Sequence, residues 1–157
     1  VDGQGNLHSI WDKNDKNNTI TFAYIESLGI PKSIFVAREL SVFDLLELYN
    51  IKNYTINNDG SIDVNGNVNL SEMSLTKLPF KFCKVSGWFD CSYNKLTSLE
   101  GAPKSVGTGF DCSYNNLKSL EGAPKSVGWG FYCEHNEKKF TEEEVRAVCN
   151  VKGNIYL

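Results

Sequence analysis

The spacing of apolar residues changes twice along the first third of the chain. Residues 1–18 are mostly polar and are interpreted as a loop. Residues 19–40 leave two interpretations open, because alternation at their start favours a strand whereas a run ending at Gly29 suits a helix; we expect a strand and then a helix. Over 42–49, apolar residues recur at helical spacing behind Ser41 and Asp44, which resemble a capping box and predict a helix.

From Tyr54 onward the apolar residues alternate with a period of two. Three short runs are separated by Asn58-Asp59-Gly60 and Asn65-Gly66, and such pairs supply the positive φ angles of tight turns. We expect a β-hairpin that feeds a third strand. Near the other end, Thr141 with Glu144 predicts a capped helix to about residue 149, and "NIYL" is expected to close the chain as a strand.

One 21-residue stretch of the chain is repeated in tandem almost unchanged. "FDCSYNKLTSLEGAPKSVGTG" (89–109) is followed by "FDCSYNNLKSLEGAPKSVGWG" (110–130), which differs at three of its 21 positions. A fixed period of this length with a repeated apolar skeleton predicts a solenoid, in which each unit buries its face against its neighbours. The columns of the skeleton are Val68, Phe89, Phe110 and Phe131; Leu70, Cys91, Cys112 and Cys133; Leu75, Leu96 and Leu117; Leu78, Leu99 and Leu120; and Val85, Val106 and Val127.

These residues carry a resemblance to a known family. "FDCSYNKLTSL" resembles the leucine-rich-repeat core L-x-L-x-x-N-x-L-x-x-L, and "LEGAPKSV" resembles the short proline-bearing return of its bacterial type. The units are similar to leucine-rich-repeat proteins commonly encoded by tailed phages and some bacteria. The resemblance implies an α+β fold with a short solenoid of parallel strands, an N-terminal α/β cap and a C-terminal helical cap. The implied domains are residues 1–50, 51–136 and 137–157.

Alternation within the strand of each unit points the phenylalanine and cysteine inward and the residues between them outward. Asn94, Asn115 and Asn136 are then expected to stack as a ladder whose amides satisfy backbone groups where the chain leaves the strand. Pro103 and Pro124 are expected to fix the return turn, and the repeated glycines to allow tight bends. These glycines are Gly101, Gly107, Gly109, Gly122, Gly128 and Gly130.

Composition narrows the classes of function. Lys+Arg 16 against Asp+Glu 19 gives a net charge of -3, which argues against a nucleic-acid footprint or a basic membrane-surface patch. No apolar run is long enough to span a membrane, and the first residues do not form a signal peptide. Because the only methionine is Met73, we expect a processed chain or part of a longer one. The five cysteines, without a CxxC pair, favour reduced thiols and a cytoplasmic location.

Two sequence features suggest metal sites, but each has a simpler explanation. The cysteine column is interpreted as buried thiols, because in-register cysteines have poor disulfide geometry and "CEH" at 133–135 offers the one histidine near a cysteine for zinc. "DVNGNV" and "DKNDKNN" hint at calcium loops but lack the full spacing, so turn chemistry explains them better. We expect no metal and no cofactor.

A second resemblance favours a different class of function. "LGIPKSIFVAREL" (28–40) resembles the turn and recognition helix of helix-turn-helix regulators. Helical spacing places Arg38 and Glu39 at positions where that motif has apolar core residues, which weakens the resemblance. A DNA-binding regulator that uses residues 19–40 is therefore the alternative function and not the preferred one. No catalytic motif is visible, and we expect no enzyme.

The outward strand positions form the preferred candidate site. Ser92 and Ser113 are expected to lie outward beside the aspartates, on a sheet face edged by tyrosine and tryptophan. Exposed aromatic residues anchor interfaces, and acidic groups among them would select a protein partner with a basic surface. The alternatives are a solvated sheet copied with the repeat, or a structural domain of a larger virion or effector protein. The predicted partner-binding residues are Trp88, Asp90, Tyr93, Asp111, Tyr114, Trp129, Tyr132, Glu134 and His135.

Overall fold

A computed structural model describes residues 7–8, 19–20 and 41–157. The chain divides into two compact units, Val1–Asn50 and Ile51–Leu157. The predicted helix within 21–40, the helix-turn-helix segment from 21 on and the "DKNDKNN" stretch lie outside the described residues. No helix among the described residues is long and apolar enough to cross a membrane.

The described part of the first unit contains one short strand pair and one helix. β1 (Leu7–His8) pairs antiparallel with β2 (Thr19–Ile20). α2 (Val42–Leu48) confirms the helix predicted there, because Ser41 accepts a hydrogen bond from the Asp44 N–H and the Asp44 carboxylate accepts one from the Ser41 N–H at 2.8 Å. This reciprocal pair satisfies two N–H groups that the first turn leaves without helical partners.

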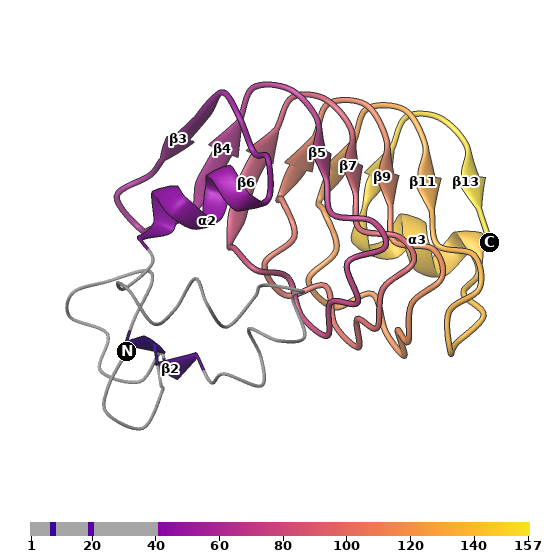
Figure 1. The fold of residues 1–157 in the computed structure, drawn as a ribbon. Helices are drawn as coiled ribbons and strands as arrows, with labels where there is room; N and C mark the ends of the chain where they lie inside the picture. Colours follow the sequence, from indigo (N-terminus) through magenta and orange to yellow (C-terminus); the bar gives the residue numbers. More distant parts are fainter. Residues whose placement is uncertain (1–6, 9–18, 21–40) are drawn as a thin grey trace. The chain divides into compact units, whose positions relative to one another are not determined.

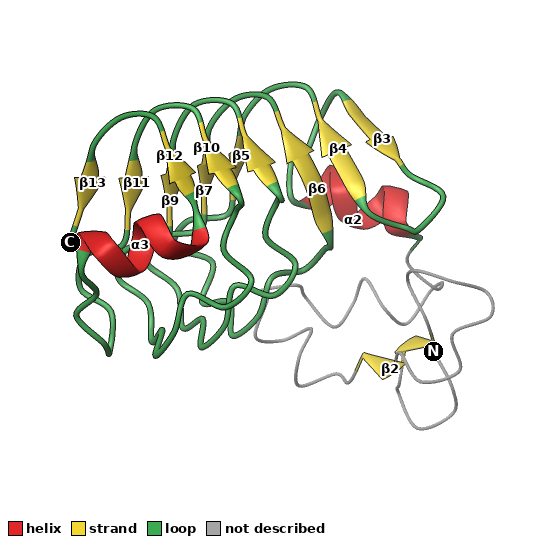
Figure 2. Cartoon of the chain, turned by 180° about the vertical axis from the view of Figure 1, so that it is seen from behind, coloured by secondary structure: helices red, strands yellow, loops and turns green. Residues whose placement is uncertain are grey.

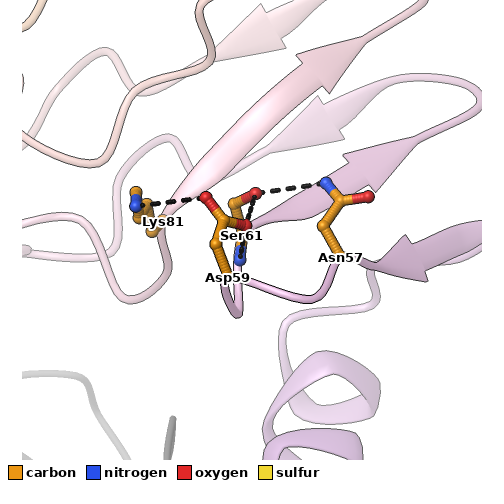
Figure 3. Close-up of polar contacts among 4 residues, drawn as sticks. All are labelled: Asn57, Asp59, Ser61 and Lys81. Atoms are coloured by element: carbon orange, nitrogen blue, oxygen red, sulfur yellow. Dashed lines mark hydrogen bonds and ion pairs between the residues drawn. The ribbon is translucent and has the colours of Figure 1, made fainter.

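The second unit begins with the predicted hairpin. β3 (Tyr54–Ile56) and β4 (Ile62–Val64) pair antiparallel across a turn in which the Ser61 hydroxyl donates to Asp59 at 2.5 Å and accepts from the Asn57 amide at 3.1 Å. Lys81 completes the cluster 3.4 Å from Asp59, as Figure 3 shows. The hydrogen bonds from Ser61, followed by the charge of Lys81, lower the pKa of Asp59 to about 2.

The third predicted strand lies in a second sheet. Residues 65–67 form a corner, and β5 (Val68–Asn69) lies in a second sheet instead of pairing with β4. Gly66 has a φ of 144°, and its N–H is held by the Ser86 hydroxyl at 2.9 Å from the next coil. The Asn65-Gly66 pair therefore turns the chain between sheets and does not close a hairpin.

The remainder is a solenoid of five coils, each with two short strands joined by a three-residue corner (Figures 1 and 2). The first sheet has the order β12-β10-β8-β6-β4-β3 and the second the order β13-β11-β9-β7-β5. All neighbours are parallel except β3 and β4. The later strands are β6 (Phe82–Val85), β7 (Phe89–Asp90), β8 (Ser105–Val106), β9 (Phe110–Asp111), β10 (Ser126–Val127), β11 (Phe131–Tyr132), β12 (Asn150–Val151) and β13 (Ile155–Tyr156).

The last return between coils contains a helix. α3 (Glu142–Val148) begins at the predicted capping box, where the Glu144 N–H donates to the Thr141 hydroxyl and the Thr141 N–H donates back to the carboxylate at 3.0 Å. β13 then pairs parallel with β11, which confirms the strand expected at the end of the chain. Two helices among many parallel strands make the described residues a β-solenoid, and the finer α+β description stays a prediction.

The core consists of the predicted apolar columns. Phe89, Phe110 and Phe131 are fully buried, with successive ring centroids 5.7 and 5.2 Å apart. Burial of one such ring contributes roughly 1.5–3 kcal/mol, so the repeat stabilises each coil against the next. The cysteine column is also buried, and each thiol donates to a carbonyl of the following coil, as Cys91 does to Asp111 at 3.3 Å. Burial raises the pKa of Cys133 to about 12.

The asparagine ladder is confirmed. The Asn115 amide donates to the Cys91 and Cys112 carbonyls at 2.9 and 3.2 Å, and its Oδ1 accepts from the Leu96 N–H at 2.9 Å. Asn94 and Asn136 repeat this pattern one coil to either side. Each amide therefore satisfies backbone groups of two adjacent coils that burial would otherwise leave unpaired.

The repeated glycines serve more than one purpose. Gly101 and Gly122 have φ angles of 91° and 85°, as a tight bend requires. Gly107 and Gly128 do not, and a side chain there would instead collide with the backbone of the preceding coil. Gly107 and Gly128 thus lie in bends at the corners, as predicted, and the close approach of neighbouring coils there also excludes a Cβ atom.

Candidate functional site

The outer surface of the second sheet is built by strand register. Pairing aligns Asp90 with Asp111, Asp111 with Tyr132 and Tyr132 with Tyr156, because β7, β9, β11 and β13 are parallel and in step. The preceding residue is a buried phenylalanine in β7, β9 and β11 and the half-buried Ile155 in β13, so the aligned side chains project to the other side. Neighbouring parallel strands lie ~4.8 Å apart, which places two carboxylates and two phenol rings in one row.

One oxygen of each aspartate is used to fix its orientation. Oδ1 of Asp90 accepts from the Ser92 N–H at 2.9 Å and from the Ser92 hydroxyl at 2.6 Å, and Oδ1 of Asp111 accepts from the Ser113 N–H at 2.9 Å. The serines are only 4% and 5% exposed, so the prediction that they lie outward on the face is wrong. The chain turns directly after the cysteine, and the serines fold back to cap the aspartates. Oδ2 of either aspartate has no hydrogen-bond partner among the described residues.

The carboxylate of Asp111 is held in an unfavourable environment for its charge. Burial is the largest cause that raises its pKa, and the charges of Asp90 and Glu134 raise it further, against the hydrogen bond from the Ser113 N–H, which lowers it. Residues 51–157 contain twelve Lys and Arg and twelve Asp and Glu, so this crowding of acids is local. The ion pairs of the solenoid involve other acids, such as Asp59 and Glu142, and none within 41–157 reaches these three.

A stack of three rings borders the aspartates on the side where the chain leaves the strands. Tyr93 and Tyr114 have centroids 4.3 Å apart with an interplanar angle of 8°, and Tyr114 and His135 have centroids 4.4 Å apart. We call Tyr93, Tyr114 and His135 the ring stack. Tyr93 is 54% exposed and Tyr114 41% exposed. Charge from Asp111 is among the causes that raise the pKa of Tyr93, after the hydrogen bond to Tyr114 and burial.

The backbone beneath the ring stack is in the left-handed region. Tyr93, Tyr114 and His135 each have a φ of 53°, and Glu72, one coil earlier, has a φ of 60°. This conformation costs an ordinary L residue roughly 1–2 kcal/mol relative to the right-handed helical region, and glycine or asparagine adopts it more easily. The turn therefore demands the conformation in four successive coils, but nothing in the turn demands an aromatic side chain.

A second aromatic group borders the aspartates on the side of the corners. The Trp88 ring lies 5.4 Å from that of Tyr132 and 6.1 Å from that of Trp129, and Tyr132 stacks on Tyr156 at 4.4 Å. We call Trp88, Trp129, Tyr132 and Tyr156 the corner cluster. Trp129 is 59% exposed.

Two glycines make room for the corner cluster. A Cβ atom on Gly109 would collide with the Trp88 ring, and one on Gly130 would lie 2.7 Å from the ring of Tyr132. Both large side chains therefore pack against the backbone of these glycines. These glycines were predicted to serve bends, and their φ angles are not in the left-handed region.

The structure brings all the predicted site residues to this one face. Asp90 and Asp111 occupy the middle, the ring stack and the corner cluster flank them, and Glu134 is half-buried beside Asp111, whose pKa it raises. Sequence reasoning missed Tyr156, which arrives from the final strand after α3 and falls outside the 21-residue spacing. The register of β13 with β11 is what reveals it.

The described residues do not form the metal sites that the sequence hinted at. No group of three His, Cys, Asp or Glu that could hold a metal ion is present within 7–8, 19–20 and 41–157. The cysteines are all free. Comparisons with protein-family models, with curated proteins and with solved structures each find no match, so function is inferred from this face alone.

Proposed function

We propose that this chain is a short leucine-rich-repeat protein that binds another protein through the outer surface of its second sheet and catalyses no reaction. The 21-residue units and the asparagine ladder support the family assignment. We further propose residues 1–50 as the N-terminal cap and residues 137–157, with α3, as the C-terminal cap, because the end coils of a solenoid have no neighbour to cover them. The partner is a host or phage protein if the chain is phage-encoded, as its units suggest.

The observation that carries this proposal is the ring stack. Tyr93, Tyr114 and His135 occupy left-handed positions that glycine or asparagine adopts more easily, yet their rings are exposed to solvent. Strain of this kind at an exposed site is best explained by a use for the side chain. Stacking offsets part of the strain, by about 0.5–1.5 kcal/mol for each pair of rings. Tyrosine and tryptophan are also the residues that most often anchor protein interfaces.

The face limits what kind of complex forms. Five strands at ~4.8 Å spacing give a sheet roughly 19 Å across, which is small for a stable protein interface. We therefore expect a transient complex, or one that extends beyond the sheet.

Capture followed by titration of the purified pair tests this function. Bound proteins are identified with the wild-type chain as bait, and each is then titrated against wild type, a variant with W129A and Y114A, and a control with E121Q and E143Q. Glu121 and Glu143 are exposed and lie outside the face. A purified partner that binds wild type and control but not the aromatic variant supports the proposal. If the aromatic variant binds every purified partner as wild type does, the face is not the site.

A further inference from the structure

The carboxylates between the two aromatic groups point to the chemistry of the ligand. This inference rests on the proposed function and names what the face recognises. We propose that the second sheet binds an arginine side chain of an extended segment, with the guanidinium held by Asp90 and Asp111 and stacked against the flanking rings. The occupant is a peptide segment of the partner, because its chemistry complements both features of the face.

Three acidic side chains crowd together on the face without a cationic partner among residues 41–157. Asp90, Asp111 and Glu134 lie close enough for the charges of the other two to act on Asp111, and none of the three is paired with a cation within 41–157. Such crowding is unfavourable in the free protein, and a bound cation would relieve it. Both aspartates fix one oxygen on a serine and leave Oδ2 free, so the orientation of the free acceptor is set before binding.

Aromatic rings flank the aspartates on two sides. Asp111 follows the corner at 107–109 and precedes Tyr114, and it is in register with Tyr132, so its carboxylate lies between the corner cluster and the ring stack. A cation held there meets aromatic groups from both sides, and the faces of tyrosine and tryptophan attract cations within about 6 Å. Both faces of Tyr114 are covered by Tyr93 and His135 in the stack, so the uncovered face of Tyr93 and the ring of Trp129 remain for a cation, and both residues have more than half of their surface exposed.

The shape of the site favours arginine over lysine. Asp90 and Asp111 are register partners on adjacent strands, so their free oxygens are presented side by side. A planar guanidinium donates several hydrogen bonds in a fork and stacks on rings at the same time, whereas an ammonium is a compact and strongly hydrated charge. A nucleic acid would also stack on rings, but its phosphates would be repelled by the same carboxylates.

The probes are three short fluorescein-labelled peptides of alternating glycine and a second residue, which is arginine, lysine or citrulline. Citrulline keeps the shape of arginine without its charge. Binding to the whole chain is followed by fluorescence anisotropy at about 50 mM salt, where exposed charges are weakly screened. We expect the arginine peptide to bind roughly ten- to a hundredfold more tightly than the citrulline peptide, as loss of a charge-assisted contact implies. The lysine peptide should fall between them.

Variants separate this inference from the proposed function. The D90N/D111N variant keeps both side-chain shapes and should lose the preference for arginine, whereas the E121Q/E143Q control, with the same change in charge, should keep it. Equal binding of the arginine and citrulline peptides, no binding of either, or an unchanged preference in D90N/D111N would overturn the inference. If D90N/D111N still binds a purified partner that W129A/Y114A has lost, the face remains the binding site but does not recognise a cation.

Discussion

Removal of one rung of the asparagine ladder tests whether the ladder holds the coils together. Asn115 is 5% exposed and lies in a central coil. Its amide donates to the carbonyls of Cys91, Cys112 and Ser113 at 2.9, 3.2 and 3.2 Å, and its oxygen accepts from the Leu96 N–H at 2.9 Å. Asn115→Ala removes all four contacts and leaves the backbone in place.

The contacts of Asn115 differ in how much they contribute. The carbonyls that Asn115 contacts also accept from the amides of Asn94 and Asn136 and from the N–H of Tyr93. Each of these lost donations costs the low end of the usual range, about 0.5 kcal/mol. The Leu96 N–H has no second acceptor among the described residues, and an orphaned buried donor costs about 1–3 kcal/mol. The whole change should lower the free energy of unfolding by about 3 kcal/mol, or the melting temperature by more than about 10 °C.

The neighbouring residue supplies the control. Asn116 is exposed, and its backbone N–H donates to the Leu96 carbonyl at 2.9 Å, a bond that alanine keeps. The preceding coil has Lys95 at this position, so the side chain is not needed by the repeat. Urea and thermal unfolding followed by circular dichroism should therefore find Asn116→Ala within about 0.5 kcal/mol of wild type. Equal stability of the two variants would refute the role assigned to the ladder.

Three further predictions concern the coils and the face. Gly128→Ala should lower the free energy of unfolding by more than about 2 kcal/mol in urea, because its Cβ would collide with the Gly107 carbonyl; a variant as stable as wild type would contradict that corner geometry. With a thiol reagent at pH 8, Cys83 should react first, since the other four cysteines are buried and their pKa values are raised, and equal rates for all five would show an open core. The pKa of Asp111 is raised, so the folded state binds the Asp111 proton more tightly than the unfolded state does. The contribution of Asp111 to stability therefore falls as the pH rises from the unfolded pKa through the higher folded pKa. At pH 7, Asp111→Asn should accordingly melt no lower than wild type, and a clear loss of stability would mean that the carboxylate stabilises the fold.

The sequence predicts the parts of this fold that depend on columns or on capping residues. Phe89 and Cys91 point inward, Asn115 bridges two coils, and α3 begins at Thr141, because each of these features needs only a residue type at a fixed spacing. Strands β6, β8, β10 and β12 of the first sheet were not predicted. Ser105–Val106 is two residues long, which is too short for a period of two to be visible.

The details of the site depend on three-dimensional neighbours that spacing does not record. Ser92 was expected to lie outward by strict alternation, but the chain leaves the strand before it and the hydroxyl caps Asp90. The glycine at 109 accommodates a tryptophan from the coil before it, a contact between different columns of the repeat. Tyr156 joins the face only because α3 lengthens the last return. The sequence predicted most residues of the face but included the serines and omitted Tyr156, and the structure adds how the residues contact one another.

The central claim is that a basic segment binds across the second sheet, and aromatic side-chain NMR tests it most directly. The chain is labelled with carbon-13 in its tyrosine and tryptophan rings and titrated with the arginine peptide and then with the citrulline peptide. We predict shifts for Tyr93, Tyr114 and Trp129 with the arginine peptide alone, while Tyr54, on β3 of the first sheet, stays unchanged. Shifts confined to Tyr54 and other rings outside the face, or identical shifts with both peptides, would contradict the claim.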